Sequence, residues 1–137
     1  MQYKQHEERH WRHILSIPFI WGMLVPLVLF HLALEVYHVV CFWLYGIPFV
    51  QRKQYIRMDR YKLPYLSLLD RFNCIYCEYA NGLIAYAQRI AADTEKYWCG
   101  IKHDKYPGFV EPVHQEGFMH YGDKKAYAKA CKLQKRS

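Results

Sequence analysis

The stretch from Ile14 to Leu34, ILSIPFIWGMLVPLVLFHLAL, decides the fold, because its 21 residues include no Asp, Glu, Lys or Arg. At a rise of about 1.5 Å per residue, a helix of this length matches the hydrocarbon thickness of a bilayer. The stretch therefore predicts a transmembrane helix near the N-terminus. Pro18, Gly22 and Pro26 lie inside it. Because proline removes a helical hydrogen bond, we expect a kink near Pro26.

The apolar character continues beyond Glu35 as far as Val50, and this second part contains the aromatic residues Tyr37, Phe42, Trp43 and Tyr45. Aromatic side chains with a polar end favour the boundary between membrane and water. The whole apolar stretch exceeds one span and falls short of two spans plus a turn. We expect a single helix that runs long or bends into the interface, and a tight hairpin with both flanks on one side is the alternative.

The remainder of the chain predicts a small, mainly α-helical polar domain. From Leu66 to Ile90, apolar residues recur every three or four positions, which predicts a long amphipathic helix from about Pro64 to Ala92 with Ser67 or Asp70 as its cap. Four segments follow from this pattern: a polar flank (1–13), the anchor and interfacial segment (14–50), a basic helical domain (51–103), and an extended arm (104–137) that ends in a short helix from Lys124 to about Gln134, capped by Asp123.

The chain is basic, with 19 Lys and Arg against 12 Asp and Glu and a formal net charge of +7. Five of the basic residues follow the apolar segment closely: Arg52, Lys53, Arg57, Arg60 and Lys62. This position favours anionic lipid headgroups as their partners, and it places the C-terminal domain in the cytoplasm. A basic chain rich in aromatic residues can also bind nucleic acid, but the location of the charges leads us to expect none.

Cysteine and histidine spacing predicts a metal site. Cys74 and Cys77 form a C-x2-C pair, and Cys99 and His103 form a C-x3-H pair 21 residues later. Three thiolates and one imidazole at these spacings are typical of structural zinc sites, in which a closed shell stabilises the fold. The site is expected at the turn that follows the long helix, and iron-sulfur, haem and copper are the alternatives to zinc.

Two other interpretations of the cysteines stay open. Free cysteines are often buried as small apolar residues on a helix face. A disulfide or redox pair is the third interpretation, although five cysteines cannot all pair within one chain.

A second group of polar residues lies in the anchor. His31, Glu35 and His38 are spaced four and three residues apart, so one helix face carries all three. Ionisable residues at membrane depth mark candidate functional sites, and this face could serve half of a carboxylate-bridged metal site, a bis-histidine haem or a proton relay. In the alternative interpretation, Glu35 and His38 lie at the lipid boundary, Glu35 is solvated or paired to a neighbouring subunit, and His31 bonds a carbonyl.

Motifs of soluble enzymes are missing from the sequence: it has no glycine-rich phosphate loop, no G-x-S-x-G and no H-E-x-x-H. Ser and Thr are scarce, with Ser16, Ser67, Ser137 and Thr94 as the full set. We therefore expect a non-catalytic protein rather than a hydrolase or transferase.

The stretch from Arg60 to His103 resembles a group of short hypothetical bacterial inner-membrane proteins that share a YCxYANG…WCxIKH pattern. In this chain the pattern runs from Tyr76 to Gly82 and from Trp98 to His103. The resemblance implies a bacterial inner-membrane setting and carries no activity with it.

These features together predict an accessory or assembly subunit of a larger bacterial membrane complex, stabilised by zinc. The alternative from a different class is a metal-dependent membrane redox protein that holds iron, haem or copper.

Overall fold

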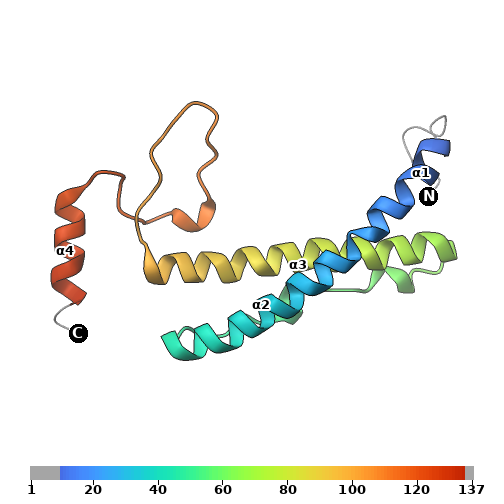
Figure 1. The fold of residues 1–137 in the computed structure, drawn as a ribbon, viewed down its shortest axis with the longest axis horizontal. Helices are drawn as coiled ribbons and strands as arrows, with labels where there is room; N and C mark the ends of the chain where they lie inside the picture. Colours follow the sequence, from blue (N-terminus) through green and yellow to red (C-terminus); the bar gives the residue numbers. More distant parts are fainter. Residues whose placement is uncertain (1–9, 135–137) are drawn as a thin grey trace. The chain divides into compact units, whose positions relative to one another are not determined.

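The computed structural model describes residues 10–134, which are mainly helical and include no β-strand (Figure 1). The chain forms two compact units, one reaching to Ile90 and the other starting at Ala91, so their boundary falls inside helix α3. The mainly α fold class predicted from the sequence is confirmed.

The apolar segment forms helix α1 (His10–Gly22) and helix α2 (Leu24–Tyr45), separated by a single turn residue, Met23. Pro26 has no N–H, so the carbonyl of Gly22 lacks its helical donor, and the break lies one turn before this proline. From Trp11 to Tyr45 the helix is long and apolar enough to cross a membrane. A single long helix is therefore present in place of the alternative hairpin.

The segment 46–67 leads from the end of α2 to the start of α3. It begins at Gly46, whose φ of 66° ends α2 in the left-handed conformation that glycine tolerates best. It contains two short 3-10 helices, η2 (Arg52–Gln54) and η3 (Arg60–Lys62). We call it the return segment, because it brings the chain back beside α2 before the next helix starts.

Helix α3 (Leu68–Trp98) is the long amphipathic helix expected from the sequence, but it begins and ends later in the chain than predicted. The Ser67 hydroxyl accepts a hydrogen bond from the N–H of Asp70 at 3.2 Å, which caps the helix as predicted. Pro64 lies before the helix instead of in its first turn, and α3 continues six residues beyond the predicted end at Ala92.

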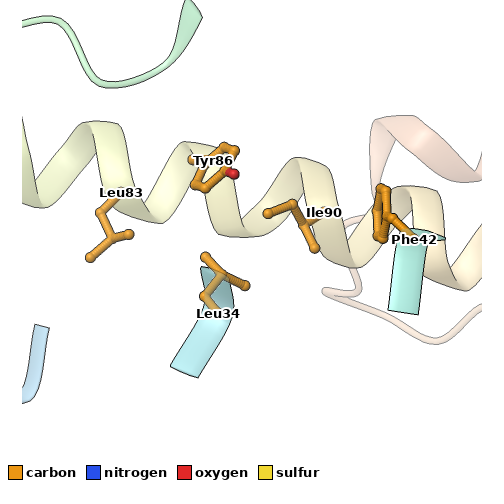
Figure 2. Packing of buried hydrophobic residues seen from close by; sticks show 5 residues of the cluster. All are labelled: Leu34, Phe42, Leu83, Tyr86 and Ile90. Carbon is orange, nitrogen blue, oxygen red and sulfur yellow. The ribbon is translucent and has the colours of Figure 1, made fainter. Parts of the chain in front are cut away.

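Helices α2 and α3 lie side by side and run in the same direction (Figure 1). Their contact buries five apolar or aromatic side chains, two from α2 and three from α3: Leu34, Phe42, Leu83, Tyr86 and Ile90 (Figure 2). These residues recur at three-, four- and eight-residue spacings, so each helix contributes one continuous face. This small core fixes the two helices against each other.

At Gly82 the backbone of the return segment lies close to the backbone of α3. A Cβ atom at this position would lie 2.7 Å from the carbonyl oxygen of Tyr55 and 2.9 Å from the Cα of Ile56. Only a residue without a side chain fits between two backbones at this separation.

The second unit contains the irregular segment 99–123 and a final helix. Ile101 and Met119 form an isolated bridge, and one 3-10 helix, η4, covers Val113–Gln115. Helix α4 (Lys124–Gln134) has the predicted bounds. Asp123 caps it, because its Oδ1 accepts hydrogen bonds from the N–H groups of residues 125 and 126 at 3.1 and 2.9 Å.

Candidate functional site

The polar face of the anchor helix, formed by His31, Glu35 and His38, lies against α3 and the return segment. Each of the two histidines meets a tyrosine of α3 that is 48 positions later in the chain, Tyr79 and Tyr86. Because the histidines and the tyrosines share a seven-residue spacing, two turns of one helix match two turns of the other. The parallel orientation of α2 and α3 makes this match possible.

His38 is the most deeply buried polar residue of this group, with 3% of its surface exposed. The backbone N–H of Val50 donates to Nε2 at 3.1 Å, so Nε2 carries no proton. Nδ1 is therefore the protonated nitrogen of a neutral imidazole, and it donates to the Tyr86 hydroxyl at 2.9 Å. Both ring nitrogens are satisfied inside the protein.

Aromatic rings enclose the His38 side chain. Phe42, Phe49 and Tyr86 each make edge-on contacts with the imidazole, with ring centroids 4.5, 5.3 and 5.7 Å away. These contacts exclude water from the ring, and they join α2, the return segment and α3 at one point.

Tyr86 stays protonated over the physiological pH range. Burial, the nearby Glu35 carboxylate and a hydrogen bond to that carboxylate raise the pKa of Tyr86 to about 12, and the Arg52 charge opposes this effect. The Tyr86 hydroxyl accepts from His38 and donates toward Glu35. A hydrogen-bonded path thus runs from the Val50 N–H through His38 and Tyr86 to Glu35.

The Glu35 carboxylate lies close to one histidine and one arginine of the same chain. Its Oε1 is 3.4 Å from Nε2 of His31 and 3.6 Å from Nη1 of Arg52 in the return segment. Nδ1 of His31 lies 3.0 Å from the hydroxyl of Tyr79, whose pKa is raised by burial. Arg52 of the same chain therefore supplies a positive charge near this carboxylate.

His38 is fully hydrogen-bonded within this group, whereas Nε2 of His31 and Oε1 of Glu35 are buried 3.4 Å apart and have no hydrogen-bond partner among the described residues. A metal or haem site needs histidine nitrogens that are free to coordinate, but His38 Nε2 is occupied by a backbone donor and Nδ1 by Tyr86. His38 therefore does not fit a bis-histidine haem. The chemistry of the group suits a polar clamp that holds two helices and the return segment in register.

A second polar contact, which the sequence did not indicate, joins the return segment to α3. Glu78 is buried, with 4% of its side chain exposed, and its Oε1 accepts from the backbone N–H of Arg60 at 3.0 Å and from its Nε at 2.8 Å. Burial alone would raise the pKa of Glu78, but the hydrogen bonds and charge of Arg60, with a further bond from Asp59, hold this pKa below its usual value.

The four predicted zinc ligands are divided between the two units. Cys74 is buried and Cys77 is exposed, both in α3 and both in the first unit. Cys99 is exposed and follows the end of α3 in the second unit, as does His103. α3 is uninterrupted between the two pairs, and a helix carries the chain onward instead of folding it back.

Residues 10–134 contain no group of three or more His, Cys, Asp or Glu side chains that could hold a metal ion. The structure therefore does not show the predicted metal-binding turn. All five cysteines are free thiols. The zinc prediction itself stays a prediction.

Sequence reasoning identified His31, Glu35 and His38 as a group and missed the partners of these residues, Tyr79, Tyr86 and Arg52. One signal was present, because Tyr79 and Tyr86 repeat the seven-residue spacing of the histidines. Both tyrosines lie in the periodic stretch from Leu66 to Ile90, where the pattern predicts a buried helix face and indicates no partner for their hydroxyl groups.

Comparisons of the chain with protein-family models, with curated proteins and with solved structures found no match.

Proposed function

We propose that this protein is a non-catalytic accessory subunit of a larger complex in the bacterial inner membrane, with its C-terminal region on the cytoplasmic side. One observation carries the proposal. The start of α3 exposes an apolar face made of Leu68, Leu69 and Phe72, which we call the α3 face. Exposed apolar faces of this kind mark sites of contact with other proteins or with lipid.

The α3 face is the uncovered end of the same helix face that packs against α2. The covered part begins at Tyr76, whose ring lies 5.6 Å from that of Trp21, and continues through Tyr79 to Ile90. At about 100° per residue, Leu69 and Phe72 lie within about 40° of Tyr76 around the helix, and Leu68 lies in the direction of Tyr86. A partner helix seated there would extend the existing helix pair, so we infer that the partner offers an apolar helix.

A role without catalysis is supported by the polar face of the anchor. Both ring nitrogens of His38 and Nδ1 of His31 are hydrogen-bonded within the fold, and Glu35 lies 3.6 Å from Arg52. The location is supported by the apolar helix from Trp11 to Tyr45 and by the basic return segment that follows it. Basic segments beside membrane helices favour the cytoplasmic face.

The experiment compares two variants with equally exposed target residues on different faces of α3. Phe72 is 58% exposed on the α3 face, and Ile84 is 57% exposed on another side of the helix. Each variant is expressed at the native level, and the membranes are extracted with mild detergent. The extracted complexes are then separated on native gels. We expect Phe72→Gln to release the chain from its complex and Ile84→Gln to leave the complex intact. Equal retention of both variants would contradict the proposal.

A further inference from the structure

From Trp21 onward, the long apolar helix is covered along one side by the rest of the first unit. Trp21 contacts Tyr76, His31 contacts Tyr79 and His38 contacts Tyr86, so α3 accompanies the apolar helix from residue 21 to residue 38. The return segment lies on it too, because Val50 donates to His38. The other sides are exposed along the helix, with Phe19, Val36 and Trp43 among the most exposed residues.

On the covered side of the apolar helix, charged groups of α3 and the return segment lie beside the stretch 14–34, which contains no Asp, Glu, Lys or Arg. Glu78 falls between Tyr76 and Tyr79, which contact Trp21 and His31 of that stretch. Arg60 binds Glu78 at 2.8 Å, and next to it Arg57 pairs with Asp59 at 2.8 Å. These last partners are open to solvent: the Arg57 side chain is 82% exposed.

A helix that crossed the bilayer with this cover would carry exposed ionic groups to hydrocarbon depth. Charged side chains at that depth are costly, and membrane proteins place them inside a bundle or a water-filled cavity. Here the Arg57, Asp59 and Arg60 side chains are exposed on the return segment, where a membrane-crossing orientation would bring them to lipid. A helix lying in the membrane plane avoids this cost, because one side meets the acyl chains and the other meets water.

We propose that the helix from Trp11 to Tyr45 lies in the plane of one leaflet of an anionic bilayer, with its exposed apolar side in the acyl chains. α3 and the return segment face the cytoplasm, and both ends of the chain lie on the cytoplasmic side. The 35 residues correspond to about 52 Å of helix, which exceeds the roughly 30 Å thickness of the hydrocarbon core. Lys53 and Lys62 are exposed and available to anionic headgroups. This inference rests on the membrane location given under Proposed function.

The first measurement is protease protection of the full chain with a short epitope tag at either end. We expect both tags to resist protease added to spheroplasts and both to be removed from inverted membrane vesicles. Cleavage of the N-terminal tag alone in spheroplasts would overturn the in-plane orientation and leave the membrane location intact. Recovery of the chain in the soluble fraction would overturn the membrane location itself, and the in-plane orientation with it.

A second measurement reports the depth of the helix in the bilayer, because protease protection shows only on which side the two ends lie. Val25, an exposed residue near the centre of the charge-free run, is replaced by Trp in a chain whose four native tryptophans are changed to Phe. In vesicles of anionic lipid, we expect stronger quenching of Val25→Trp by lipids brominated near the headgroup than by lipids brominated near the chain end. The same is expected when Trp43 is the only tryptophan retained. The opposite order at Val25 would overturn the proposal.

Discussion

The Tyr86 hydroxyl lies 2.9 Å from Nδ1 of His38, a residue 48 positions earlier on the neighbouring parallel helix. Because Val50 occupies the other nitrogen, this contact decides whether a deeply buried imidazole is fully satisfied. It joins the anchor helix to α3, and through Val50 to the return segment.

Removal of this hydroxyl should destabilise the protein. In Tyr86→Phe, the N–H of His38 loses its acceptor while it stays buried, which costs about 1–3 kcal/mol. Thermal unfolding in mild detergent, followed by circular dichroism, measures the change. Tyr65→Phe is the control, because Tyr65 is exposed, and its melting temperature should match that of the native chain. Equal melting temperatures for all three proteins would show that the hydrogen bond contributes nothing.

The contact of Gly82 with the return segment gives a second prediction. Alanine is favoured over glycine in a helix by about 1 kcal/mol, yet at this position its Cβ would approach the Tyr55 carbonyl oxygen to 2.7 Å. We expect Gly82→Ala to destabilise the protein by about 1–3 kcal/mol, because two backbones must separate. In α1, a Cβ added at Gly22 would meet no atom within 4 Å, so Gly22→Ala should be neutral or stabilising in the same unfolding assay. Stabilisation of the protein by both substitutions would contradict this prediction.

The ion pair of Glu78 and Arg60 predicts a dependence of stability on pH. The native pKa of Glu78 lies below the unfolded value of 4.5, so its contribution is complete above that pH and is lost as the pH falls through the native pKa. We expect the melting temperature of the native chain to fall more steeply than that of Glu78→Gln as the pH drops from about 5 to about 3. Parallel curves for the two proteins would exclude this ion pair as a source of acid sensitivity.

The cysteines give a prediction that separates the observed fold from the predicted zinc site. Cys77 is exposed and Cys74 is buried. In the fold described here, Cys77→Ser should leave the melting temperature unchanged, whereas Cys74→Ser should lower it, because a hydroxyl replaces a packed thiol. A zinc site would reverse the first outcome, since loss of any ligand unfolds a metal-stabilised domain. Elemental analysis of the native protein identifies the metal in that case, and visible absorption would indicate iron or haem.

Sequence patterns that reflect interactions between residues close in the chain predicted the helices well. The charge-free run predicted the long apolar helix, and Asp123 with the basic residues after it predicted the bounds of α4. The end of α3 was wrong by six residues, because its last turns depend on contacts made later in the chain. There Glu95 accepts from Gln115 at 2.7 Å and lies 2.6 Å from Nε2 of His114.

The candidate site was predictable only in part, since pairing between helices is not a local property. The spacing of His31, Glu35 and His38 identified one helix face, but nothing local indicates that α3 returns parallel to it and supplies Tyr79 and Tyr86. The cysteine spacing suggested zinc because such spacings occur around turns. In this chain the sequence between Cys77 and Cys99 is helical. Helix α3 therefore extends through the region where a metal-binding turn was expected.

The central claim, that this chain is a membrane-bound subunit of a larger assembly, is tested most directly on the native protein. Membranes are washed with alkaline carbonate, extracted with mild detergent and separated on a native gel, and the chain is detected with an antibody. We expect the chain to stay with the membranes after the wash and to migrate in a complex much larger than its own mass of 16.6 kDa plus detergent. Recovery of the chain as a monomer, or in the carbonate-soluble fraction, would contradict the claim.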